Sequence, residues 1–88
     1  MSEDSLPALP GFREMALRRM ADSRADLMHD LAARREAVGL TQTEVAALMG
    51  TSQSAVARLE AGTADLRAST LERYAAAVGA HIDWKITS

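Results

Sequence analysis

Apolar and polar positions in the first half of the chain follow the period of an α-helix. When successive residues are placed 100° apart, six apolar positions between about Phe12 and Val38 fall within one stripe about 100° wide. The stripe consists of Phe12, Ala16, Met20, Leu27, Leu31 and Val38. Asp22 and Ser23, near the middle of this region, are residue types that cap helices. The pattern predicts helical structure over residues 12–38, formed either by one long helix or by two consecutive helices.

The next helix is predicted by a capping box. Thr41 and Glu44 have the spacing that lets the threonine side chain cap the amide of Glu44 while the carboxylate reaches back. Gly50 tolerates positive φ and marks the end of this helix. The positions expected to face inward are Val45, Ala46, Leu48 and Met49.

A third helix completes the spacing of a helix-turn-helix. Ser52 is a suitable N-cap for a helix from Gln53 to about Ala61, in which Val56 and Leu59 face inward. The two short helices are then joined by residues 49–52, as in a helix-turn-helix.

The exposed side of the third helix indicates contact with DNA. Gln53 and Ser54 point outward at its N-terminus, and Arg58 follows four residues after Ser54 on the same side. A short polar turn of this kind fits the major groove, where Gln, Ser and Arg pair with base edges.

A second capping box predicts a fourth helix. Ser69 and Glu72 repeat the spacing of the first box, and we expect a helix from Thr70 to Val78 that ends before Gly79.

The pattern then changes to a period of two. Ile82, Trp84 and Ile86 alternate with polar residues, which is typical of a half-buried strand. A single strand leaves its backbone groups unpaired, and no other segment of the sequence indicates a strand. The strand either pairs with its counterpart in a second copy, forming an antiparallel two-chain sheet, or folds back on its own subunit. The pattern favours the first alternative.

Composition excludes several classes of site. The 88 residues include no cysteine, which excludes disulfides, zinc–thiolate centres and thiol catalysis. The two histidines are isolated in the sequence, so we expect no metal site. No nucleophile elbow, GxGxxG motif or P-loop occurs, so we expect no cofactor and no enzymatic activity. No apolar stretch approaches the ~20 residues of a membrane span, and the N-terminal region lacks the basic start of a secretory signal. The sequence therefore predicts a cytoplasmic protein.

The run from Gly39 to Gly62 resembles the lambda-repressor/Cro-like (XRE) helix-turn-helix family, and the resemblance covers roughly residues 27–79. It implies phosphate contacts by Gln42, Thr51, Ser52 and Thr63. It also implies base reading by Gln53, Ser54, Arg58 and, through contact with a thymine methyl group, Ala57. The Arg34-Arg35 pair is interpreted as a solvated surface, with a phosphate contact as the alternative.

A narrower resemblance concerns the C-terminal part. Residues 65–75, followed by Val78-Gly79 and the alternating segment, are similar to HigA-like antitoxins. That resemblance implies a RelE/HigB-like ribonuclease toxin as partner and repression of the protein's own operon. The apolar stripe that extends beyond the domain indicates either a partner contact or packing on the chain's own domain. The candidate toxin-binding residues are Phe12, Met15, Ala16 and Met20, and Met28 would also suit an adaptable contact.

The formal charge of −2 is unevenly distributed. Residues 1–33 contain six acidic and four basic residues, whereas the chain from Arg34 onward contains six of each. The DNA-facing region is thus neutral, and a basic toxin could dock on the N-terminal arm. Few phosphate contacts imply weak binding by a monomer, so dimerisation must supply much of the affinity.

These observations predict an all-α fold of four to five helices with a Cro-like helix-turn-helix. Residues 1–10 would be a flexible tail, 11–26 a helical extension, 27–79 the DNA-binding domain and 80–88 a strand that pairs across a dimer.

The predicted function is that of a DNA-binding repressor and antitoxin, with operator DNA, a second copy and a toxin as partners. The alternatives are a stand-alone, phage-type regulator and an interaction module that has lost DNA binding. The polar Gln53, Ser54 and Arg58 argue against the last.

Overall fold

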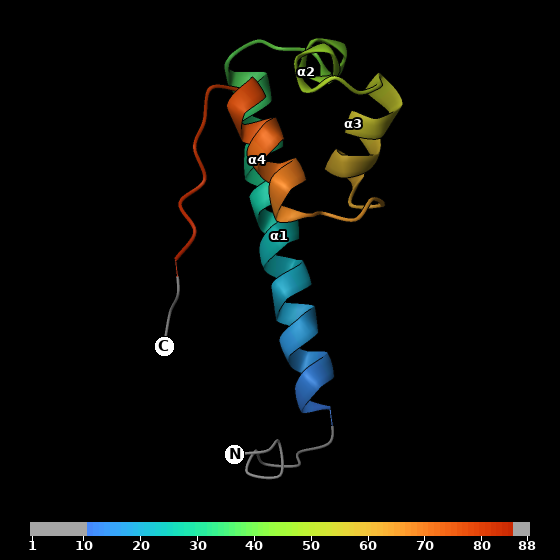
Figure 1. Cartoon of the computed structure of the whole chain (residues 1–88), viewed down its shortest axis with the longest axis vertical. Helices are drawn as coiled ribbons and strands as arrows, with labels where there is room; N and C mark the ends of the chain where they lie inside the picture. Colours follow the sequence, from blue (N-terminus) through green and yellow to red (C-terminus); the bar gives the residue numbers. More distant parts are fainter. Residues whose placement is uncertain (1–10, 86–88) are drawn as a thin grey trace.

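The computed structural model describes residues 11–85, and over this range the chain is entirely α-helical apart from its connections (Figure 1). The helices are α1 (Phe12–Ala37), α2 (Gln42–Met49), α3 (Gln53–Ala61) and α4 (Ala68–Ala77). The expected all-α fold is confirmed for this range. The predicted tail, residues 1–10, lies outside the described residues. Within the described range, no helix is long and apolar enough to cross a membrane.

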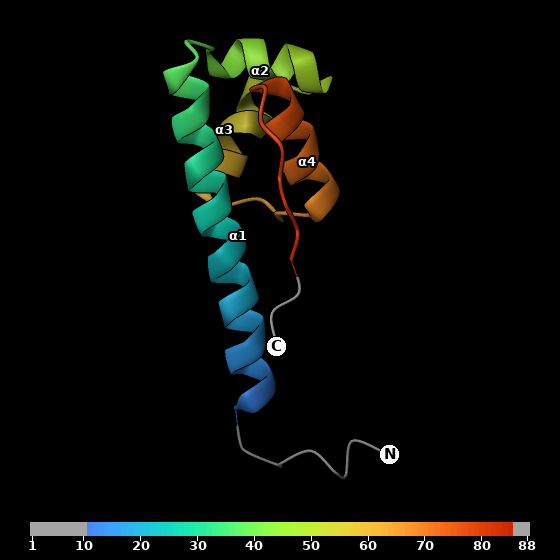
Figure 2. The same cartoon turned by 90° about the vertical axis from the view of Figure 1, so that its left-hand side faces the viewer.

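The first helical region forms one continuous helix. α1 contains 26 residues, about 39 Å at 1.5 Å per residue, and the potential caps Asp22 and Ser23 lie exposed within it. Its C-terminal half packs against α3 and α4, whereas its N-terminal half extends past the other helices (Figures 1 and 2). The backbone of the predicted helical extension is therefore continuous with the domain.

The core lies between the C-terminal half of α1 and the other three helices. The buried apolar residues are Met28, Leu31, Val45, Ala46, Met49, Val56, Leu59, Leu71, Tyr74, Ala75 and Val78. Met28 is only 2% exposed, so its suggested use as a partner contact is wrong. Val38 lies just beyond the end of α1 and is exposed. The apolar stripe of α1 therefore ends before the predicted position.

The predicted starts of α2 and α3 are confirmed. The amide of Glu44 donates to Thr41 Oγ1 at 3.0 Å, and the Glu44 carboxylate accepts from the Thr41 amide at 2.9 Å. Ser52 caps α3 by accepting from the amide of Ala55 at 3.1 Å. Both helices thus begin where side-chain oxygens satisfy free backbone N–H groups.

Two finer predictions about the helices are wrong. Leu48 is 64% exposed, because α2 buries the face formed by Val45, Ala46 and Met49 and Leu48 falls to one side of it. Ser69 does not cap α4, since the helix already begins at Ala68 and Ser69 lies within its first turn.

The segment after α4 forms no strand between residues 80 and 85 in this single chain. It runs back along α4 (Figures 1 and 2), where Ile82 packs against the core and Trp84 Nε1 donates to Glu72 Oε1 at 3.0 Å. The segment thus takes the second predicted arrangement, folded back on its own subunit. A strand needs a neighbour for its backbone groups, and pairing with a second copy stays a prediction. Ile86 lies outside the described residues.

Candidate nucleic-acid interface

The turn between α2 and α3 holds the two helices in a fixed arrangement. Gly50 has φ of 71°, a left-handed conformation that side chains disfavour, and it ends α2 where the chain turns toward α3. Ala46 is buried at 2% exposure in the core that α2 shares with α3. On α3, Val56 and Leu59 are buried, which fixes which side of the helix faces outward.

The outward side of α3 presents the predicted base-reading residues. Gln53, Ser54 and Arg58 are exposed, and Ala57 is half-buried. Among the described residues, no hydrogen bond or ion pair holds the guanidinium of Arg58. The Ser54 hydroxyl lies 3.2 Å from that of Ser52. The recognition side of the helix therefore carries polar groups that are available to a ligand.

The predicted phosphate-contacting residues lie around this helix and already make local hydrogen bonds. Thr51 and Ser52 are exposed just before α3, and Thr63 is exposed just after it. The hydroxyl of Thr63 donates to the carbonyl of Arg58 at 3.3 Å, and Ser52 caps α3. Gln42 is half-buried at the start of α2 and faces α3.

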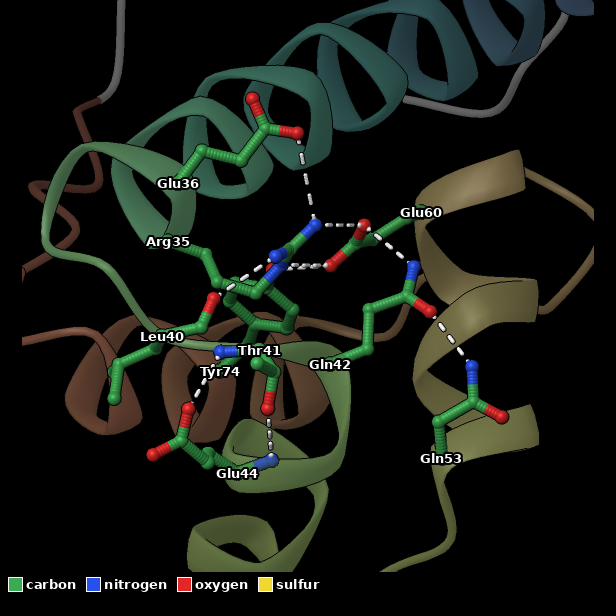
Figure 3. A network of polar contacts seen from close by, with 9 residues as sticks. All are labelled: Arg35, Glu36, Leu40, Thr41, Gln42, Glu44, Gln53, Glu60 and Tyr74. Carbon is green, nitrogen blue, oxygen red and sulfur yellow. Dashed lines mark hydrogen bonds and ion pairs between the residues drawn. The ribbon is translucent and has the colours of Figure 1, made fainter.

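A network of polar side chains centred on Glu60 lies beside this surface (Figure 3). Arg35 forms a bidentate ion pair with Glu60, with Nε donating to Oε2 at 2.8 Å and Nη2 to Oε1 at 3.0 Å. The Tyr74 hydroxyl donates to Oε2 at 2.6 Å, and Gln42 Nε2 donates to Oε1 at 3.0 Å. Gln42 Oε1 in turn accepts from Gln53 Nε2 at 2.7 Å. Sequence reasoning identified Gln42 and Gln53 but gave no role to Glu60, which joins them to the core.

The network shifts the protonation equilibria of its members. Burial alone would raise the pKa of Glu60, but the hydrogen bonds from Arg35, Tyr74 and Gln42 outweigh burial and hold that pKa below its ordinary value. The hydrogen bond to Glu60 raises the pKa of Arg35. Burial and the bond to Glu60 raise the pKa of Tyr74. Glu60 and Arg35 are therefore charged and Tyr74 is neutral at neutral pH.

Two arginines of α1, Arg34 and Arg35, donate hydrogen bonds to groups of the protein itself. Arg35 also donates to the carbonyl of Leu40 at 2.9 Å, and its side chain is only 11% exposed, so it is not available to a phosphate. Arg34 donates to the carbonyls of Val78 and Gly79 at 3.3 and 3.5 Å, at the end of α4. The interpretation of this pair as a solvated surface is therefore wrong for Arg35.

A second candidate surface lies on the half of α1 that extends past the domain. Met15, Leu17 and Met20 are each more than half exposed, and Ala16 is half-buried. An open groove of about 440 Å³ lies between this part of α1 and the loop between α3 and α4. Its apolar lining includes Leu17, Met20 and Leu66, of which only Met20 was predicted. Phe12 begins α1, but its side chain is not among those that the structure describes.

Two short helices joined by a tight glycine turn, with a polar face on the second, define a helix-turn-helix DNA-binding protein. Comparison with protein families agrees, since the family model described as "Helix-turn-helix" matches residues 31–85. The chain belongs to this family of DNA-binding transcription regulators.

Among curated proteins, the chain is similar to one from Mycobacterium tuberculosis (strain ATCC 25618 / H37Rv) named "Putative antitoxin HigA3". The two are 47% identical over 60 residues, which cover 66% of this chain and 55% of that protein. The chain thus spans about half the length of this curated relative. Comparison with solved structures found no match.

Proposed function

We propose that this protein is a sequence-specific transcriptional repressor and the antitoxin of a type II toxin–antitoxin pair. In this role it represses its own operon and neutralises a RelE/HigB-like toxin. The observation that carries the DNA-binding part is α3, which buries Val56 and Leu59 while Gln53, Ser54 and Arg58 stay exposed. The antitoxin part is supported by the similarity to a protein named as an antitoxin and by the exposed apolar half of α1.

Co-expression with the adjacent gene tests the whole proposal. The product of that gene should be captured with this protein, and the complex should shift the DNA upstream of the two genes. A protein that shifts this DNA but captures no partner would instead be a stand-alone regulator. A protein that captures a partner but shifts no DNA would be an interaction module.

Within this function, we assign base reading to the exposed Gln53, Ser54 and Arg58 and the half-buried Ala57, with phosphate contacts by Gln42, Thr51, Ser52 and Thr63. We also propose that residues 80–88 pair two copies through Ile82, Trp84 and Ile86, so that each dimer binds two half-sites.

Removing the guanidinium of Arg58 is expected to relax specificity at one base pair. If Arg58 pairs with guanine, Arg58→Ala should cost about 1–3 kcal/mol at that position and leave the preference elsewhere unchanged. The measurement is a titration of the DNA site that the wild-type protein prefers, and of single-base variants of that site, at constant salt. Arg67→Ala is the matched control, because Arg67 is an exposed arginine already paired with Asp65 at 3.3 Å. Equal weakening on every sequence would contradict base reading and make Arg58 a phosphate contact.

Introducing a charge into the groove on α1 is expected to disrupt toxin binding. Met20→Glu places a carboxylate among apolar groove residues, and we expect at least ~10-fold weaker capture of the toxin because that charge would lose its water at the interface. DNA binding should be unchanged, since the groove that Met20 lines lies at the C-terminal end of α3, whereas Gln53 and Ser54 lie at its N-terminal end. Val38→Glu is the control, at an exposed apolar residue just after the other end of α1. If both variants capture the toxin normally, the toxin docks elsewhere.

A further inference from the structure

A continuous series of hydrogen bonds links the ion pair of Arg35 and Glu60 to the exposed start of α3 (Figure 3). Glu60 and Gln53 both belong to α3 but are separated by about two helical turns. Gln42 on α2 bridges them, accepting from Gln53 at 2.7 Å and donating to Glu60 at 3.0 Å. The amide of Gln42 thus touches both the part-buried carboxylate and the exposed start of α3.

The carboxylate determines which way each amide in this series is turned. An ionised carboxylate only accepts hydrogen bonds, and both oxygens of Glu60 already accept from Arg35. Gln42 can therefore approach Oε1 only with its NH₂ group, which turns its carbonyl oxygen toward Gln53. Gln53 must donate to that oxygen with its own NH₂ group. Its carbonyl oxygen and one amide hydrogen take no part in these hydrogen bonds. The order of acceptor and donor at the start of α3 is thereby fixed.

We infer that Glu60 is a positioning residue for base recognition, acting through Gln42 to set the orientation of the Gln53 amide. The inference rests on the proposed function, in which Gln53 reads a base. A glutamine that pairs with adenine must place its oxygen at the N6 amino group and its NH₂ at N7. A reversed amide would place its NH₂ against the N6 amino group and its oxygen against N7, and neither pair can form a hydrogen bond. An amide that is already oriented needs no reordering when DNA binds. Glu60 therefore contributes to sequence preference without touching DNA.

Four variants of the full chain separate this role from a structural one. A library of random duplex DNA first defines the preferred site of the wild-type protein, and Gln53→Ala identifies the base pair that Gln53 reads. Glu60→Gln removes the acceptor-only group, and Gln42→Leu breaks the series while leaving the bonds of Glu60 to Arg35 and Tyr74 in place. Tyr74→Phe is the matched control, because it removes one bond to the same carboxylate on the core side. Circular dichroism and melting curves establish that each variant is folded at the assay temperature.

We expect Glu60→Gln and Gln42→Leu to lose about fivefold or more of the preference at the base pair that Gln53→Ala identifies, and to keep their preferences elsewhere. Tyr74→Phe should lower the melting temperature but keep the preference. If Glu60→Gln does not fold, Gln42→Leu alone decides the outcome. The inference is overturned if the folded variants bind every site more weakly by the same factor. A wild-type protein that enriches no sequence overturns the proposed function as well.

Discussion

Replacing Arg35 by methionine is expected to lower the free energy of unfolding by about 3 kcal/mol, the lower end of the cost of removing one partner from a buried ion pair, because this pair is part-buried. The side chains of Arg35 and Glu60 are each only 11% exposed, and they share two hydrogen bonds. Methionine fills a similar volume but leaves the carboxylate of Glu60 with Tyr74 and Gln42 as its only donors among the described residues. It also leaves the carbonyl of Leu40 without its guanidinium donor.

The measurement is a urea unfolding curve at pH 7. Arg34→Met is the matched control, because the neighbouring arginine makes only longer bonds of 3.3 and 3.5 Å to carbonyls at the end of α4. We expect that control to lose about 1 kcal/mol or less. If both variants lose the same free energy of unfolding, the ion pair contributes no more to stability than the hydrogen bonds of Arg34.

The same ion pair gives stability a defined pH dependence. Because the pKa of Glu60 is lower in the folded protein than in the unfolded chain, its contribution is complete above the ordinary glutamate pKa of about 4.3. It is lost as the pH falls through the lowered value in the folded state. In Arg35→Met the carboxylate is more easily protonated, so the difference between variant and wild type should shrink on acidification. A difference that stays constant between pH 7 and 3 would contradict this account.

The starts of α2 and α3 could be predicted because their signals are local. A threonine or serine oxygen that caps an amide three residues later needs only its own turn of chain. The interior of α1 carried no such decisive signal, since Asp22 and Ser23 are tolerated within a helix as well as at its start. The sequence therefore left open whether α1 is interrupted at these residues.

The two wrong predictions about the helices, for Leu48 and Ser69, concern features that the local sequence does not determine. Leu48 looks like a core residue, but the positions of α3 and α4 decide which stripe of α2 is covered. Ser69 has a good capping spacing, yet α4 begins at Ala68, so Ser69 lies within its first turn and does not cap it.

The network around Glu60 had no signal in the sequence. Its partners Arg35, Gln42 and Tyr74 are between 14 and 25 residues away, so no period or short motif relates them. Tyr74 is fully buried. Only the fold reveals that its hydroxyl completes the environment of a carboxylate.

The use of arginines within the fold strengthens the argument that DNA binding needs two copies. Arg34, Arg35 and Arg73 donate to groups of the protein itself, whereas Arg58 on α3 is exposed and its guanidinium makes no such bond among the described residues. A protein that neutralises few phosphates gains little from the release of counterions. Affinity must then come from base contacts and from the joining of two half-sites in one complex.

Deleting residues 80–88 is accordingly expected to yield a monomer that binds its operator about 100-fold more weakly or worse, because a second half-site is no longer held at high effective concentration. In the single chain residues 80–85 lie along α4, with Trp84 bonded to Glu72 yet still half exposed, so a second copy can cover the apolar side of these residues without unfolding the helices. Sedimentation gives the oligomeric state, and titration of a two-half-site duplex gives the affinity. The control is His81→Ala with Asp83→Ala, which changes only the polar alternate positions and should leave the dimer intact. A truncated protein that remains a dimer would place the interface on the helices instead, most plainly at the exposed Leu48 of α2.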